Sequence, residues 1–247
     1  MSVLAATSAL FEVVREIGES DCEELGTGFL AQPVNALTSL AYVVVGGITL
    51  GIAVRHRHPS LETWVFAVLL AAVGLGSVAF HGPQPGGARV MHDLPILLLV
   101  VFIIAHDVKV LRPRGPSAWA YFVPAAVLST GVMLVSVDVG AAFTGAGVVT
   151  VAVLEFVIYR RRLRPLDDSR RRRSAVMIIA VSAVAGATWL LGRTDSPACD
   201  PDGILQVHGL WHVLSAVVFG LWWWLALDVG VRRADNATSE RRSPAAR

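Results

Sequence analysis

Charged residues are scarce in this sequence of 247 residues. They make up 16% of it, hydrophobic residues make up 54%, and the mean hydropathy is +0.60. Soluble domains usually carry about 25% charged residues, so the composition excludes a soluble domain of this size and indicates a membrane-embedded protein. The basic residues form short clusters between apolar runs, as they do in membrane-protein loops. We therefore expect an integral membrane protein with no nucleic-acid partner, and nothing in the sequence implies a protein partner.

Lysine occurs only once, at Lys109, in a stretch that separates two apolar runs. A retinal protein forms its Schiff base with a lysine in the middle of a membrane helix, so the sequence excludes this class. Residues 1–18 lack the basic start of a secretory signal, and no repeat of roughly 20 to 50 residues is visible. We expect one domain, preceded by a short amphipathic segment at the membrane surface.

Seven apolar runs are each long enough to cross the hydrocarbon core of a bilayer, which takes about 20 residues per helix. Proline- and glycine-containing stretches separate them, and the weakest boundary lies around Asp138 and Gly140. The sequence thus predicts an all-α membrane protein, a seven-transmembrane helix bundle. The predicted spans are residues 33–54, 61–81, 92–108, 116–136, 139–159, 174–192 and 206–230.

Basic residues are distributed unequally between the two sets of loops that seven spans create. Of the 21 lysines and arginines, all except Arg15, Arg89 and Arg193 fall in one set or in the C-terminal tail. Because cytoplasmic loops carry the excess of basic residues, we predict that the N-terminus is outside and the C-terminus cytoplasmic. The predicted segments are an extracytoplasmic N-terminal segment (1–32), a seven-transmembrane domain (33–230) and a basic cytoplasmic tail (231–247).

Polar side chains four residues apart interrupt two of the apolar runs. On a helix, Ser77 lies over His81 and His208 lies over His212. The predicted topology places both pairs at the outer ends of their spans, in the same layer as Asp93. Ionisable groups inside spans are costly and usually mark a functional centre, and three histidines with an open fourth position form the ligand set of a catalytic zinc. The pattern favours a metal or cofactor site on the extracytoplasmic side over histidines that serve only helix packing.

Five short motifs are spread along the chain: Cys22-Glu23-Glu24, Asn35 at the start of the first span, Gly76-Ser77-x-x-Phe80-His81, Asp93-Leu94-Pro95 and His208-x-x-Trp211-His212. Together, in this order, they resemble the alkaline ceramidase family. That family belongs to a wider group of seven-helix membrane hydrolases that includes the adiponectin receptor relatives. The resemblance extends from Cys22 to His212.

The resemblance implies that residues 33–230 form a hydrolase domain in which His81, His208 and His212 hold a zinc ion. It further implies that Ser77 and Asp93 lie beside the zinc and that the reaction hydrolyses the amide bond of a ceramide or a similar N-acylated lipid. An amide carbonyl is a poor electrophile, and zinc can polarise its oxygen. In this reaction we expect Asp93 to carry a proton from water to the leaving amine, and Ser77 to donate a hydrogen bond to the developing oxyanion.

Animal members of the family hold a calcium ion with acidic residues near the Cys-Glu-Glu motif. The resemblance therefore also suggests a calcium site at Glu23 and Glu24, which we expect to be weak. This chain departs from the animal pattern in two places, because Gln32 stands where those members have a glutamate and Leu25 follows Glu24.

Two other classes of function stay open at this stage. A membrane haem protein can use paired histidines on two helices as axial ligands, and a zinc-containing lipid receptor without turnover would have the same residues. For a hydrolase, we expect the lipid substrate to enter sideways from the bilayer. Small residues of the spans either allow close helix packing or leave room for acyl tails. They are Gly74, Gly76, Ala142, Gly145, Gly147, Ala183, Ala185 and Gly186.

Cys22 and Cys199 are the only cysteines, and the predicted topology places both on the outer side of the membrane. An oxidising exterior permits a disulfide there, which would tie the N-terminal segment to the loop before His208. Two free thiols are the alternative.

Other polar and aromatic residues of the spans are expected to serve the membrane interface. We predict that His92 faces the loop and not the metal. His106, Asp107 and Glu155 lie near the inner ends of their spans, where they can extend towards the basic loops. Trp222 to Trp224 are expected to be interfacial anchors.

Overall fold

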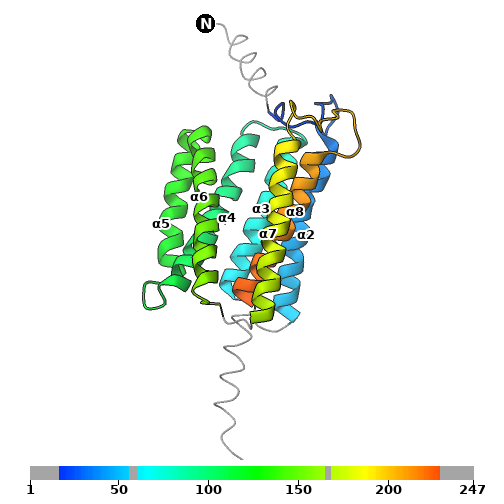
Figure 1. Cartoon of the computed structure of the whole chain (residues 1–247). Helices are drawn as coiled ribbons and strands as arrows, with labels where there is room; N and C mark the ends of the chain where they lie inside the picture. The colour runs from blue at the N-terminus through cyan, green and yellow to red at the C-terminus, as the bar shows by residue number, and fades with distance from the viewer. Residues whose placement is uncertain (1–16, 56–59, 165–167, 229–247) are drawn as a thin grey trace, which may run out of the picture.

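Seven helices run side by side in the computed structural model of the chain, which describes residues 17–55, 60–164 and 168–228 (Figure 1). Apart from one isolated β-bridge, these residues contain no strand, so the prediction of an all-helical bundle is confirmed. The elements are α2 (Pro33–Arg55), α3 (Leu61–His81), α4 (Ala88–Leu111), α5 (Ala118–Val135), α6 (Val137–Arg160), α7 (Asp168–Leu191), α8 (Val207–Trp223) and a short π-helix, η1 (Trp224–Asp228).

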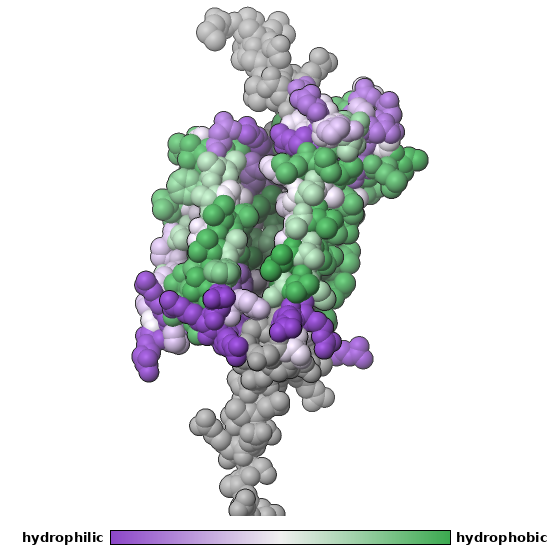
Figure 2. All heavy atoms as spheres, viewed as in Figure 1, coloured by the Kyte–Doolittle hydropathy of each residue, from purple (hydrophilic) through white to green (hydrophobic). Residues whose placement is uncertain are grey.

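Six of the helices, α2 to α6 and α8, are long and apolar enough to cross a membrane. Helix α7 starts within an arginine run, and its apolar part, Ala175–Leu191, is shorter. It nevertheless runs along the bundle beside α8 (Figure 1). A band of hydrophobic surface separates two hydrophilic ends (Figure 2), as membrane embedding requires. The crossing by α7 and the side on which each terminus lies stay predictions.

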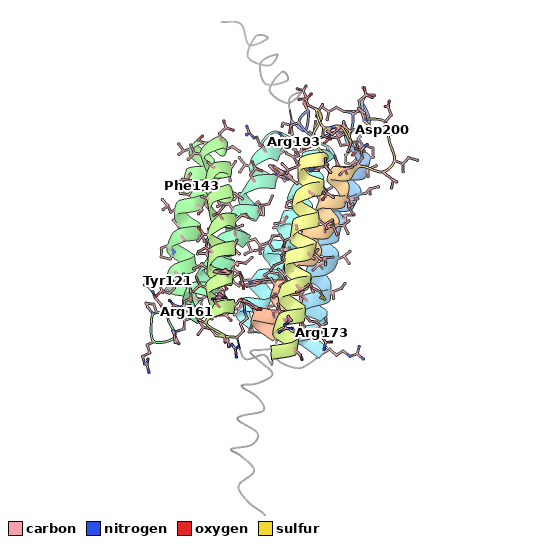
Figure 3. The ribbon with its side chains drawn as sticks, viewed as in Figure 1. Tyr121, Phe143, Arg161, Arg173, Arg193 and Asp200 are labelled. Atoms are coloured by element: carbon pink, nitrogen blue, oxygen red, sulfur yellow. A yellow bond between two sulfur atoms is a disulfide. The ribbon has the colours of Figure 1, made fainter. Side chains whose placement is uncertain are left out.

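The two ends of the bundle differ, and we name them by their residues. The histidine end carries His81, His208 and His212, together with Arg193 and Asp200 of the loop after α7 (Figure 3). The arginine end is the opposite end, with Arg161 and Arg173 (Figure 3). The predicted tail, 231–247, lies outside the described residues.

Helices α2, α3, α4 and α8 form the compact part of the bundle. Phe66, Leu70, Leu99 and Phe102 make its core and are almost fully buried. Helices α5 and α6 pack on α4, whereas α7 packs on α8. As a result α6 and α7, although consecutive, stand apart, and the surface is hollowed between them (Figure 2).

Serine residues cap the N-termini of three helices. Ser60, Ser117 and Ser136 each accept the backbone N–H three residues ahead, which satisfies one of the free amides of a first helical turn. Ser136 is also the only residue between α5 and α6. The weak boundary expected around Asp138 is therefore a one-residue junction, and Asp138 lies in the first turn of α6.

The tryptophans near the end of α8 differ from the expectation. Trp222 and Trp223 belong to the buried core, and only Trp224 is exposed. The anchor prediction is therefore wrong for Trp222 and Trp223. Their place in the chain, next to the basic tail, does not reveal which way an indole ring points, because that depends on the rotation of α8 against α3 and α4.

Two loops cover the histidine end. The disulfide between Cys22 and Cys199 joins them, with 5.4 Å between the Cα atoms, and confirms the predicted bridge. Backbone hydrogen bonds reinforce it, from the Cys22 N–H to the Gly192 carbonyl (2.9 Å) and from the Glu24 N–H to the Pro201 carbonyl (3.1 Å). The segment before α2 is thus held against the loop that leads into His208.

Candidate metal centre

Three buried histidines meet at the histidine end. His81 is the last residue of α3, and His208 and His212 lie in the first two turns of α8. One ring nitrogen from each lies within 4.8 Å of the others, and the three residues are 0%, 6% and 2% exposed. The predicted histidine cluster therefore forms, although no hydrogen bond links its members.

His81 is oriented by Gln32. The Nδ1 of His81 lies 2.7 Å from the Oε1 of Gln32, while the Nε2 of Gln32 donates to the carbonyl of Glu23 at 2.6 Å and to that of Gly18 at 3.0 Å. These carbonyls accept only, so they determine which end of the amide faces the histidine. Because Oε1 is an acceptor, His81 carries its hydrogen on Nδ1, and its Nε2 keeps a free lone pair.

Two hydroxyl groups of α2 orient His212 in the same way. The Oγ1 of Thr38 and the Oγ of Ser39 each lie 3.2 Å from its Nδ1. Each hydroxyl gives its one hydrogen to a backbone carbonyl, Thr38 to Val34 and Ser39 to Asn35, both at 2.7 Å. They therefore act as acceptors towards His212, so Nδ1 carries the hydrogen and Nε2 is free.

An acidic side chain faces the third histidine. The Nδ1 of His208 lies 3.4 Å from a carboxylate oxygen of Asp21. This is an ion-pair contact and not a hydrogen bond, since the Nδ1 of His208 has no hydrogen-bond partner. Burial raises the pKa of Asp21 to about 6, against the opposing effects of the Arg193 and His92 charges. At neutral pH and above the carboxylate is therefore ionised, which favours a hydrogen on the Nδ1 of His208.

The ring nitrogens that have no hydrogen-bond partner are suited to bind a metal ion. The Nε2 atoms of His81 and His212 are buried without any hydrogen-bond partner, and a buried polar atom without a partner is costly. Neutral imidazoles whose other nitrogen is held by an acceptor are the usual form of metal-binding histidine. The residues fit a metal ion bound by three histidines, and this donor set suits zinc among other first-row metals.

A close contact between α3 and α4 brings the Asp93-Leu94-Pro95 motif next to the helix turn before His81. A Cβ on Gly76 of α3 would lie 1.9 Å from the Met91 carbonyl oxygen of α4, so only glycine permits this approach. Pro95, four residues after Met91, has no N–H to offer that carbonyl. Gly76 and Pro95 thus both serve the close approach at the Met91 carbonyl. This approach places the helix turn of Ser77 next to the turn that carries Asp93.

Ser77 is buried one turn before His81, and Asp93 is partly buried in the second turn of α4. His92 differs from the expectation that it faces the loop. Its ring centroid lies 4.6 Å from that of Phe80 and 6.0 Å from that of His81, and its Nδ1 is 2.6 Å from the Oδ1 of Asp93. Helix α4 starts four residues before the predicted span, which places His92 inside the helix.

The acidic residues that the resemblance assigned to calcium lie in the segment before α2. Glu23 is buried, and its two carboxylate oxygens accept the N–H groups of Val34 and Asn35, each at 2.7 Å. These amides belong to the first turn of α2, where free N–H groups and the helix dipole stabilise a negative charge. Glu24 is exposed.

A sequence model of the Ceramidase family matches residues 22–242 of the chain. The chain belongs to the ceramidase family. The match confirms the resemblance to this family and includes the histidine cluster, both cysteines and every described helix. Among proteins of curated function, none matches the chain.

This ceramidase-family chain also buries polar groups at the arginine end. Arg164 forms two hydrogen bonds with Glu155 of α6, one of them 2.6 Å long, and a third of 3.3 Å with Asp107 of α4. The indole N–H of Trp222 donates to Glu155 at 2.6 Å. Burial alone would lower the pKa of Arg164, but Glu155 and Asp107 raise it. As expected, Asp107 and Glu155 extend towards a basic loop, since both contact Arg164 of the loop after α6, although the Asp107 side chain is fully buried.

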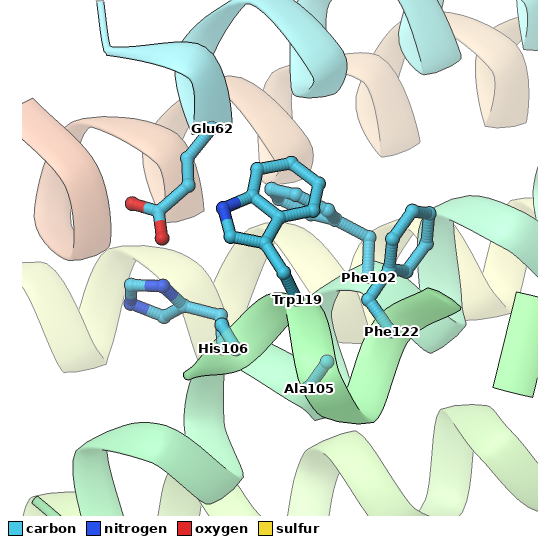
Figure 4. Close-up of a pocket in the computed structure, with 7 residues that line it drawn as sticks. Glu62, Phe102, Ala105, His106, Trp119 and Phe122 are labelled. Atoms are coloured by element: carbon cyan, nitrogen blue, oxygen red, sulfur yellow. The ribbon is translucent and has the colours of Figure 1, made fainter. Parts of the chain in front are cut away.

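A small aromatic pocket lies beside this ion cluster. Phe102, Trp119 and Phe122 form its apolar wall, and Glu62 and His106 face one another across its open side (Figure 4). The His106 ring also packs edge-on against Trp222, with 5.5 Å between centroids. The pocket is remote from the histidine cluster in the chain and in the bundle, so it belongs to the packing of α3, α4 and α5.

Several residues of the metal centre were not predicted as such. Asp21, Gln32, Thr38 and Ser39 orient the histidines, yet only Gln32 was singled out, as a departure from the animal calcium pattern. A signal was present, because Thr38 and Ser39 are adjacent hydroxyl residues inside an apolar span. Such residues also commonly bond to their own helix, so the signal does not indicate a partner by itself.

Proposed function

We propose that this chain is a zinc-dependent intramembrane amidohydrolase that cleaves the amide bond of ceramide or a similar N-acylated lipid. The products are a free fatty acid and a sphingoid base or other amine. The observation that carries the proposal is the buried group of three histidines, each with a ring nitrogen that has no hydrogen-bond partner: Nε2 of His81, Nε2 of His212 and Nδ1 of His208. The chain that holds them belongs to the ceramidase family. The zinc would be held by His81, His208 and His212.

Zinc, when bound, acts as a Lewis acid that polarises a carbonyl oxygen and lowers the pKa of a coordinated water to about 7. The residues of the chain hold this site open, since three histidines leave a coordination position for reactants. Gln32 holds the His81 ring by its Nδ1, and Thr38 and Ser39 hold the His212 ring in the same way. Asp21 faces the Nδ1 of His208 at 3.4 Å. The rings are thus oriented before any substrate arrives.

Asp93 is the proposed proton carrier. It would accept a proton from the attacking water as the oxygen bonds to the carbonyl carbon, and return it to the nitrogen as the carbon–nitrogen bond breaks. The contact between the Nδ1 of His92 and the Oδ1 of Asp93, 2.6 Å, supports this role because it orients the carboxylate. His92 would therefore act as a positioning residue.

Ser77 is the proposed oxyanion donor. It is buried on the same face of α3 as His81, one turn earlier, so its hydroxyl is held close to the metal ligands. A hydroxyl that donates to the developing negative charge lowers the barrier of amide hydrolysis. No histidine is dedicated to activating Ser77, so we do not assign it as a nucleophile.

The hollow between α6 and α7 supports entry of a lipid from the side (Figure 2). A Cβ on Gly145 of α6 or on Gly186 of α7 would meet nothing within 4 Å. By contrast, a Cβ on Gly147 would lie 2.6 Å from Val100, and one on Gly74 would lie 2.8 Å from Val43. Among the small residues, Gly74, Gly76 and Gly147 therefore serve helix packing, while Gly145 and Gly186 leave room for acyl tails.

The two other functions are less well supported by this geometry. Two axial histidines of a haem lie on opposite faces of the iron, whereas here three ring nitrogens converge on one point. A zinc-containing receptor without turnover would need no proton carrier, so the role proposed for Asp93 distinguishes it from the hydrolase. Purified protein that shows a Soret band would favour haem, and a colourless sample with near-stoichiometric zinc would favour the hydrolase.

The decisive experiment is incubation of purified protein with ceramide and other N-acylated lipids, followed by mass spectrometry of the lipids. We expect a fatty acid and an amine in equal amounts, and no products from a His212→Ala protein. Wild-type protein that carries zinc and releases neither product from any N-acylated lipid would contradict the proposal and favour the receptor.

A further inference from the structure

Three backbone carbonyls of the N-terminal segment point at the side-chain nitrogen of Gln32. The Nε2 atom lies 2.6 Å from the oxygen of Glu23, 3.0 Å from that of Gly18 and 3.4 Å from that of Asp21. Gln32 is completely buried. Its amide carries two hydrogens, which the three oxygens share.

Converging carbonyl oxygens repel one another unless a positive group lies between them. Proteins place either N–H donors or a hard cation in such a position, and calcium takes six to eight oxygens at about 2.3–2.6 Å. Here the neutral amide of Gln32 occupies the centre, at hydrogen-bond distances. The side chain of Glu23 does not offer a free oxygen to a cation, since both of its carboxylate oxygens accept N–H groups of α2.

We propose that the Gln32 amide replaces a cation in this chain, so that the N-terminal segment folds and His81 is oriented without calcium. The donor set does not fit a calcium ion as it stands, because the nitrogen hydrogens fill the position where the carbonyls converge. The other end of the same amide accepts from the Nδ1 of His81 at 2.7 Å. One neutral side chain therefore links the fold of the segment to the orientation of the histidine.

Glutamate at position 32 would make the N-terminal segment depend on a bound cation. One carboxylate oxygen would face the carbonyls of Gly18, Asp21 and Glu23 with no hydrogen between them. A divalent cation would relieve the repulsion and would use all four oxygens as ligands. The other carboxylate oxygen would still accept from His81, so the histidine would keep its orientation once the cation is bound.

The test compares thermal unfolding and zinc content of wild-type, Gln32→Glu and Gln32→Met proteins in detergent. All are prepared in buffer stripped of divalent ions by a resin, because a soluble chelator would also compete for zinc, and each is then measured with and without added calcium chloride. We expect no shift of Tm for the wild type. We expect a lower Tm and less zinc for Gln32→Glu, with the Tm restored by calcium and the zinc content restored when zinc is added together with calcium. We expect a low Tm for Gln32→Met that calcium does not restore.

Calcium binding measured by titration calorimetry gives the direct readout, with Glu24→Gln as a control that removes an exposed acidic group. We expect no binding to the wild type or to this control, and one calcium per molecule of Gln32→Glu. Wild-type protein that binds calcium or gains stability from it would overturn the proposal. So would a Gln32→Glu protein that calcium does not restore, or one as stable as the wild type without calcium. Neither measurement requires turnover, so the outcome is independent of the proposed ceramide hydrolysis.

Discussion

The two ends of the helix bundle each bury a group of polar side chains, and the groups differ in what they leave unpaired. At the arginine end, Arg164 is paired with Glu155 and Asp107, and Trp222 adds a further hydrogen bond. At the histidine end, acceptors contact the Nδ1 atoms of His81 and His212. The Nε2 atoms of these two residues and the Nδ1 of His208 have no hydrogen-bond partner.

Buried polar side chains therefore serve two different purposes in this bundle: they connect helices at the arginine end, and they offer free ring nitrogens at the histidine end. Oppositely charged groups in contact connect helices. Here Arg164 contacts Asp107 of α4 and Glu155 of α6, and Glu155 also accepts from Trp222 of α8, so the group joins these three helices. Neutral rings that present free lone pairs repel one another and gain most from a cation placed between them. At the arginine end the unpartnered atoms, the Oδ2 of Asp107 and the Nε of Arg164, belong to groups whose other atoms are paired. At the histidine end the free ring nitrogens converge, so that they could hold a metal ion.

The strongest test of this comparison removes one histidine ligand. In His212→Ala the remaining two histidines are too few for tight zinc binding, so zinc content and lipid hydrolysis should fall together to background. Metal analysis by inductively coupled plasma mass spectrometry and the lipid assay measure both quantities. Full zinc with full activity in this variant would rule out the assigned ligand set.

Asp93→Asn should lower catalytic activity without lowering zinc binding. Loss of the proton carrier is expected to lower kcat by roughly 10²–10⁴, while zinc content stays near the wild-type value. His92→Phe is the matched comparison, because it removes only the contact that orients the carboxylate and should cost less. An Asp93→Asn protein with a normal rate would exclude the proton-carrier role.

Ser77→Ala should give a smaller loss in the same assay. Removal of one oxyanion donor typically lowers kcat by roughly 10²–10³, and neither zinc content nor Tm should change much, because the substitution keeps a small residue on α3. Ser129, buried on α5, offers a control: Ser129→Ala should leave the rate unchanged. If both serine variants have the wild-type rate, Ser77 has no catalytic role.

Disruption of the arginine end should affect stability and not metal binding. Glu155→Gln removes the negative charge and one of the two oxygens that accept from Arg164, and loss of the charged partner from a buried pair costs about 3 kcal/mol. We expect a lower Tm with unchanged zinc per folded molecule. Trp222→Phe, which removes one hydrogen bond to Glu155, should produce a smaller shift. Zinc loss in Glu155→Gln would show that the two ends are coupled.

The smallest expected effect concerns the hollow between α6 and α7. Gly145→Trp should slow hydrolysis of long-chain substrates while zinc content stays constant, because a Cβ there meets open space. Gly147→Trp is the contrasting variant and should lower Tm, since its side chain would collide with Val100. An unchanged rate in Gly145→Trp would place the acyl tails elsewhere.

Helix positions were largely predictable because they depend on local composition. The predicted span 61–81 coincides with α3, and the others differ mainly at their ends, where caps and neighbouring turns decide. The errors concern side-chain direction. Trp222, Trp223 and His92 lie near span ends, where hydropathy cannot distinguish a residue at the interface from one that packs against another helix.

The sequence by itself determined the membrane class, the helices, the family and the identity of the three histidines, since all of these follow from composition, spacing and short motifs. Only the tertiary structure decided which ring nitrogen of His81 and of His212 is free. The acceptors come from distant parts of the chain: Gln32 is 49 residues from His81, and Thr38 and Ser39 are 174 and 173 residues from His212. A histidine's tautomer depends on the partner that folding brings to its Nδ1, and no spacing within a helix specifies that partner.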